Sequence, residues 1–116
     1  VASAESPVHA NYKQAIVDAA DTGTVMLNRS GSPCVRALKT ERSLALYAAG
    51  SMDRAELKTV QQLYFGGDME ASVGLAGQTA GLIHAVLPVA DIIRQTVDGF
   101  HRIRREQGER SMAGGF

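Results

Sequence analysis

Three glycines, Gly74, Gly77 and Gly81, mark the stretch of the chain with the clearest potential for chemistry, and Gln78 and Thr79 lie between the last two. Glycine lets the backbone approach a ligand closely. Exposed N–H groups at a helix start favour anions or polar ring edges, and the Gln78 amide can both donate and accept a hydrogen bond. The pattern permits a ligand-binding bend. Tight strand–helix packing also needs small residues, and it is the stronger interpretation of the pattern alone.

The histidines and the cysteine predict no chemistry of their own. His9, His84 and His101 are not spaced as metal ligands with each other or with Cys34, so we expect no metal site. A cysteine nucleophile needs a basic partner, and only Arg36 is near Cys34 in sequence; we expect a free, unreactive thiol. His9 precedes a helix, and a local cap or turn role is the stronger interpretation. We expect no catalytic residue from this chain.

Composition excludes several classes of function. The chain has 116 residues, of which 45% are hydrophobic and 5% aromatic, and none is Trp. Twelve Lys and Arg balance twelve Asp and Glu, so we expect neither nucleic acid nor an anionic membrane surface as a partner. No apolar run approaches the ~20 residues that span a bilayer. The single cysteine forms no internal disulfide, which makes a reducing, cytoplasmic location the default.

Hydrophobic spacing and turn residues predict a mainly helical chain with short strands. In chain order, we expect a strand end at 1–4, a helix over 11–20, a strand at 24–27, a loop at 28–33 and helical pieces over 35–49. A helix between Asp53 and Gly66, a strand at 71–75, a helix from Pro88 and a frayed tail at 111–116 should follow. Asn11 with Gln14 should cap the first helix, Gly50 should end the pieces over 35–49, and Asp53 and Glu56 should form a second capping pair. The chain begins with Val1 rather than Met and enters strand-like residues at once, so we expect polypeptide upstream.

Several segments, in order along nearly the whole chain, together resemble one family. These segments are Glu5–Lys13, Asp21-Thr22 with Val25–Leu27, Arg36–Lys39, Gly67–Ala71, Ala76–Ile83 and Pro88–Ile93. Through them the chain resembles the nitronate monooxygenases (2-nitropropane dioxygenases) and the FMN-dependent enoyl-[acyl-carrier-protein] reductases. The block Ala-Gly-Gln-x-x-Gly-Leu-Ile is the most specific of these segments.

The resemblance implies an α/β fold, namely the C-terminal portion of a TIM-like (β/α)8 barrel with a mostly helical cap segment. Residues 1–27 would form the end of the barrel and the first helix after the flavin-phosphate loop. Residues 28–70 would form the cap, and residues 71–116 would return to the barrel and end in the terminal helix. Phosphate sites of such barrels lie in the loops after the last strands.

The resemblance also implies a site. Ala76, Gly77 and Gln78 would bind FMN, and Leu75 would form part of the substrate pocket wall. The family's flavin-phosphate loop and its catalytic histidine belong to upstream segments that this chain does not contain. We therefore expect the chain to work with an upstream barrel portion, supplied by the same or a separate polypeptide.

The resemblance implies an FMN-dependent oxidoreductase but leaves two substrates open. One is a nitronate, a small molecule oxidised with O₂. The other is an enoyl or acyl thioester, reduced with NAD(P)H as the electron donor. The alternative from a different class is a small helical interaction module without catalysis, which the capped amphipathic helices and the neutral charge support.

Overall fold

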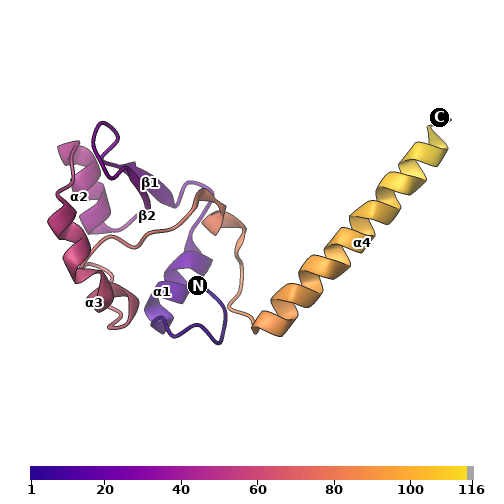
Figure 1. Ribbon diagram of the computed structural model, residues 1–116, viewed down its shortest axis with the longest axis horizontal. Coiled ribbons are helices and arrows are strands. Elements are labelled where there is room, and N and C mark those ends of the chain that lie inside the picture. Colours follow the sequence, from indigo (N-terminus) through magenta and orange to yellow (C-terminus); the bar gives the residue numbers. More distant parts are fainter. Residues whose placement is uncertain (115–116) are drawn as a thin grey trace. The chain divides into compact units, whose positions relative to one another are not determined.

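The computed structural model describes residues 1–114 and divides the chain into two compact units, Val1–Val86 and Leu87–Phe116. The elements follow the chain in the order α1 (Ala10–Asp18), β1 (Thr24–Leu27), β2 (Val35–Leu38), α2 (Glu41–Ala49), the 3₁₀ helix η1 (Arg54–Thr59), α3 (Val60–Tyr64), the 3₁₀ helix η2 (Gln78–Leu82) and α4 (Val89–Ala113) (Figure 1). The prediction of a mainly helical chain with short strands is confirmed.

The sheet of the first unit is an antiparallel hairpin. Strand β1 pairs with β2 from Thr24 opposite Leu38 to Leu27 opposite Val35. The loop between them turns at Asn28, which has a φ of 56° and whose side-chain amide donates to the Pro33 carbonyl over 2.8 Å. The strand predicted at 24–27 and the loop at 28–33 are confirmed.

The prediction of helical pieces over 35–49 is right only for its second half. Residues 35–38 form β2 because both edges of this segment are used by other parts of the chain. One edge pairs with β1. On the other, the Leu38 N–H donates to the Gly74 carbonyl over 2.8 Å, and the Ala76 N–H donates to the Arg36 carbonyl over 3.1 Å. These partners lie far away in sequence, so the local apolar pattern does not reveal them.

The strand predicted at 71–75 is reduced to a single antiparallel bridge between Ala37 and Leu75. Residues 68–71 are held in a turn by a hydrogen bond from the Ala71 N–H to the Asp68 carbonyl over 3.2 Å, which leaves only the end of the segment extended beside β2. The strand end predicted at 1–4 is wrong, because the chain turns there, with the Ser6 N–H donating to the Ser3 carbonyl over 3.2 Å.

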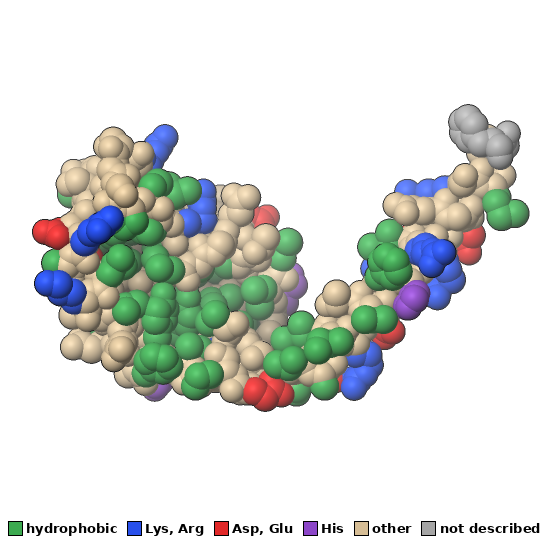
Figure 2. Space-filling model, in the orientation of Figure 1, with side chains coloured by type: hydrophobic (Ala, Val, Ile, Leu, Met, Phe, Trp, Pro, Cys, Tyr) green, Lys and Arg blue, Asp and Glu red, His purple; other side chains and the backbone are tan. Residues whose placement is uncertain are grey.

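The core of the first unit consists of two apolar clusters on either side of this small sheet. Both depend on alternation along the strands, because successive side chains of a strand point to opposite faces. The first cluster contains Tyr12, Ile16, Leu38, Leu63 and Ala80. The second contains Val25, Leu27, Ala37, Met52 and Val73. Exposed apolar side chains nevertheless remain on this unit, and Figure 2 shows hydrophobic side chains gathered across its visible face.

Helix α1 begins one residue earlier than predicted because His9, not Asn11, is its N-cap. The His9 Nδ1 accepts from the Asn11 N–H over 3.1 Å, which confirms the local cap role expected of this histidine. The Asn11 side chain is used elsewhere: its Nδ2 donates to the Gly67 carbonyl over 2.9 Å. Gln14 completes no capping box and donates instead to Asp18 over 2.8 Å.

Side-chain caps also set the boundaries of the next helices. Thr40 and Ser43 form a capping box at the start of α2. Gly50, with a φ of 79°, ends it as predicted, since glycine adopts the left-handed region without steric cost. Asp53 caps η1 by accepting from the Ala55 N–H over 2.9 Å. Glu56 does not complete a capping pair there but binds Arg42.

The second unit is the helix α4, which starts directly after Pro88, its N-cap. It runs to Ala113, so the frayed tail is wrong for residues 111–113, and the last two residues of that prediction lie outside the described part of the chain. One face carries an apolar stripe formed by Val89, Ile92, Ile93, Val97, Phe100 and Ile103. Among residues 1–114, no helix is both long and apolar enough to cross a membrane.

We predict that Leu63→Ala lowers the free energy of unfolding by about 2–5 kcal/mol, because Leu63 is fully buried in the first cluster and its loss leaves a cavity. Denaturant unfolding measures this change. Leu44→Ala removes the same atoms from a side chain that is 46% exposed and should change stability by less than about 0.5 kcal/mol. Equal losses in both variants would contradict this account of the core.

Candidate functional site

A cavity of about 220 Å³ lies where the glycine-rich stretch leaves the edge of β2. Leu75, Ala76 and Gly77 all line it, so the structure brings three of the four predicted site residues together. Gln78 is not part of the lining: it is exposed and begins η2. The remaining walls come from the chain start, α1 and η2, through Val1, Ala2, Tyr12, Ile16, Thr79, Ala80 and Ile83.

Two tyrosines form hydrogen bonds with both polar groups of the Leu75 backbone. The Tyr12 hydroxyl donates to the Leu75 carbonyl, and the Tyr64 hydroxyl accepts from the Leu75 N–H over 3.1 Å. The two rings meet edge to face with centroids 4.8 Å apart. Because α1 and α3 carry these rings, the packing of two helices determines where the bend at 75–78 lies.

The environment of Tyr12 keeps its hydroxyl protonated. Burial of the ring raises the pKa of Tyr12 above its ordinary range, and the neighbouring Tyr64 hydroxyl raises it further. A phenol buried in this way keeps its proton and can serve as a hydrogen-bond donor. This matches its role at the Leu75 carbonyl.

Packing within the chain accounts for two of the three glycines. A Cβ at Gly81 would lie 2.9 Å from both the Cα and the N of Asp21, so η2 can pack on that turn only through glycine. A Cβ at Gly74 would lie 3.2 Å from the Tyr12 ring. At these two positions tight packing explains the glycine, which is the interpretation that the glycine spacing in the sequence favoured.

Gly77 differs from Gly74 and Gly81. Its backbone is extended, with a φ of −74° and a ψ of 163°, which any residue can adopt. A Cβ there would meet only the Thr79 Oγ1 at 3.7 Å, an ordinary contact. Neither conformation nor packing within residues 1–114 therefore requires glycine at this position. The absent side chain leaves open space beside the cavity, as close approach by a ligand or by another chain would need.

The three consecutive residues 76–78 differ in whether their polar groups already have hydrogen-bond partners. The Ala76 N–H is already used by the Arg36 carbonyl. Among residues 1–114, neither the Gly77 N–H nor the Gln78 side chain has a hydrogen-bond partner. Polar contact with a bound molecule is therefore open to Gly77 and Gln78 but not to the Ala76 N–H.

Tyr12 and Tyr64 were not predicted as site residues. The sequence does carry a signal for them, because buried tyrosines need partners for their hydroxyls and the chain has only three tyrosines and no Trp. Their targets are the two backbone polar groups of Leu75, which lies 63 residues from Tyr12 and 11 from Tyr64, and only the tertiary structure identifies them.

The remaining candidate residues lie outside this cavity. Cys34 is an exposed free thiol in the loop before β2. In the part of the chain that the structure describes, no group of His, Cys, Asp and Glu side chains is arranged to hold a metal ion.

Comparison with known proteins finds similar solved structures. FabK from Thermotoga maritima has 28% sequence identity and a TM-score of 0.82, and the match covers 94% of this chain and 37% of FabK. A single-substitution mutant of the same FabK has 30% identity and a TM-score of 0.78, with coverage of 94% and 34%. No family model and no curated protein matches the chain. The chain thus spans about a third of the length of the FabK structures.

We predict opposite effects for two matched glycine substitutions. Gly81→Ala should lower the free energy of unfolding by about 1–3 kcal/mol, because its Cβ would overlap the Asp21 backbone. Gly77→Ala should leave it unchanged or raise it by up to about 1 kcal/mol, since alanine restricts the unfolded chain. Denaturant unfolding of both variants tests this. A large loss for Gly77→Ala would show that the chain itself needs this glycine.

We predict a pH dependence from Tyr12. Below its ordinary pKa of 10.0, the folded and unfolded states both hold the phenol proton. Above it, Tyr12 ionises in the unfolded chain but stays neutral in the fold, so the free energy of unfolding falls as the pH rises. Tyr12→Phe should make the decline above about pH 10 less steep.

Leu63→Ala provides the control for this experiment, because it weakens the same cluster without removing a titrating group. It should lower stability at every pH and keep the steep decline. If Tyr12→Phe and Leu63→Ala shift the curve in parallel, the proposed contribution of Tyr12 is wrong.

Proposed function

We propose that the chain is the C-terminal part of an FMN-dependent oxidoreductase of the nitronate monooxygenase and enoyl-[acyl-carrier-protein] reductase type. The observation that carries this proposal is the likeness to FabK, an FMN-dependent enoyl-[acyl-carrier-protein] reductase, over 94% of the chain. The sequence resemblance supports the same class through independent segments spread from Glu5 to Ile93.

The proposal includes a division of the whole protein. This chain spans about a third of FabK, so the upstream barrel, in the same or a separate polypeptide, would hold the flavin phosphate and supply the catalytic histidine. Residues 28–70, which contain the hairpin loop, β2, α2, η1 and α3, would form the cap. A cap excludes water from the reacting groups.

The residues of this chain fit a role at the flavin. Gly77 leaves room beside the cavity and would allow the ring to approach the backbone. Gln78, exposed and without a partner among residues 1–114, would hydrogen-bond the ring edge, and Ala76 would contact it. Leu75, 36% exposed at the cavity, would form an apolar wall for the substrate. When bound, FMN supplies the redox chemistry, while these residues position substrate and ring.

Two substrate classes fit an apolar wall next to a flavin. The likeness to FabK favours an enoyl thioester, reduced with NAD(P)H as donor. A nitronate oxidised with O₂ remains the second candidate within the same family. A non-catalytic helical module is not favoured, because nearly all of the chain matches one section of an enzyme.

We predict that Gly77→Val in the complete protein weakens FMN binding or lowers turnover at least about tenfold, since a branched side chain would occupy the space open to the ring. Flavin fluorescence titration and steady-state turnover with an enoyl thioester or a nitronate measure the two effects. The extended backbone at residue 77 accepts valine, so the fold should persist, as circular dichroism can verify.

Cys34→Ser is the control for this experiment. Cys34 is exposed and away from the cavity lining, so this variant should keep both FMN binding and turnover. Unchanged FMN affinity and turnover in Gly77→Val would contradict the proposed contact, and a colourless complete protein would contradict the proposed function.

A further inference from the structure

A second hollow lies between the hairpin β1–β2 and helix α2, and Thr24, Val25 and Met26 of β1 line it. Its volume is about 350 Å³, within the range of small-molecule sites. Three of its eight lining residues are cationic, namely Arg29, Arg36 and Lys39, and none is acidic. This concentration is notable because the chain as a whole has no net charge.

Carboxylates do not neutralise these cations. No ion pair joins Arg29, Arg36 or Lys39 to an acidic side chain among residues 1–114. The neighbouring Arg42 shows the contrast, because its guanidinium binds Glu56 and its backbone N–H donates to Glu70 over 2.9 Å. The groove therefore presents cations whose charge is not already used by the fold.

One of these cations is held in place. Arg36 projects from β2, and its Nη1 donates to the Thr24 Oγ1 on β1 over 3.1 Å. Only part of the guanidinium's hydrogen-bonding capacity is used by this contact. Arg29 and Lys39, at the two ends of the hairpin, are exposed. A guanidinium held in place between two exposed cations suits the oxygens of a diphosphate group.

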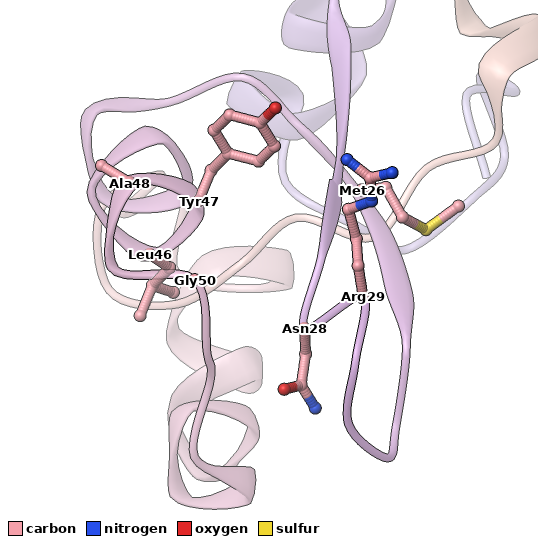
Figure 3. A pocket seen from close by; sticks show the side chains of 7 residues that line it. All are labelled: Met26, Asn28, Arg29, Leu46, Tyr47, Ala48 and Gly50. Atoms are coloured by element: carbon pink, nitrogen blue, oxygen red, sulfur yellow. The ribbon is translucent and has the colours of Figure 1, made fainter.

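The opposite wall is aromatic and apolar. Tyr47 and Leu44 on α2 line the groove and are 49% and 46% exposed. Figure 3 shows residues that line the adjoining hollow, where Tyr47 extends from α2 and Asn28 and Arg29 extend from the hairpin. Rings of nucleotide bases stack on exposed aromatic side chains. A base stacked on Tyr47 would leave its phosphates within reach of the cations of the groove.

We propose that this groove binds an adenosine diphosphate group, with the diphosphate on Arg29, Arg36 and Lys39 and the base on Tyr47. The pairing of uncompensated cations with an exposed ring, in one hollow of suitable volume, carries the proposal. Two sources share this chemistry, a nicotinamide dinucleotide and a coenzyme A thioester. The choice between them rests on the proposed function, whereas binding of the group itself does not.

Isothermal titration calorimetry of the complete protein with ADP tests the proposal. ADP should bind, and combined Arg29→Gln and Lys39→Gln substitutions should weaken binding at least about tenfold. Tyr47→Leu should weaken ADP several-fold yet leave inorganic pyrophosphate unchanged, which separates the ring contact from the charge contact. Arg54→Gln and Lys58→Gln remove the same charge outside the groove and should have no effect.

Two further arms identify the source. If NADH or NADPH binds more tightly than ADP, and the combined Arg29 and Lys39 variant loses this binding, the groove is assigned to the electron donor. Tighter binding of coenzyme A with the same loss assigns it to the thioester. No ADP binding, or equal weakening in the Arg54 and Lys58 control, would overturn the proposal. Flavin content is measured on the same samples, so a colourless protein that binds ADP would contradict the proposed function and leave this site standing.

Discussion

The hydrogen bonds from Tyr12 and Tyr64 to the backbone of Leu75 are the contacts on which the candidate site depends. They join α1 and α3 to the segment at 75–78 that runs beside β2, and Tyr12 lies 63 residues from Leu75. Burial of Tyr12 removes water as a competing partner and raises the pKa of its hydroxyl, so the donor persists. The Tyr12 hydrogen bond is part-buried, and leaving such a polar group unpaired costs free energy, which gives the bend at 75–78 a defined position.

Small residues along this bend serve two different purposes. At Gly81 and Gly74 the chain packs against its own backbone and its own tyrosine ring, so a side chain would disturb the fold. At Gly77 the space beside the backbone is empty within residues 1–114. The same residue type thus closes the packing at two positions and leaves an opening at the third, and that opening coincides with the cavity lined by Leu75.

The hairpin divides the first unit chemically as well as structurally. Its inner side chains, including Val25, Leu27 and Ala37, belong to an apolar cluster. Arg36 and Leu38 share the opposite face. Leu38 belongs to the other apolar cluster, whereas Arg36 hydrogen-bonds Thr24 and lines a groove with Arg29 and Lys39, and none of these three cations forms an ion pair among residues 1–114. Strand alternation separates these two chemistries by one residue, so one short strand contributes both to the core and to the proposed nucleotide groove.

Much of the local structure was accessible from the sequence, because its causes are local. The strand at 24–27, the end of α2 at Gly50 and the cap role of His9 each follow from neighbouring residues. The family resemblance also pointed to the likeness with FabK. Only the tertiary structure decided that 35–38 is a strand with 74–76 on its second edge, that Asn11 binds Gly67 and that Tyr12 holds Leu75, since each depends on a partner remote in sequence. Local propensity is encoded in adjacent residues, whereas the partners of backbone and hydroxyl groups are determined by how the chain packs in space.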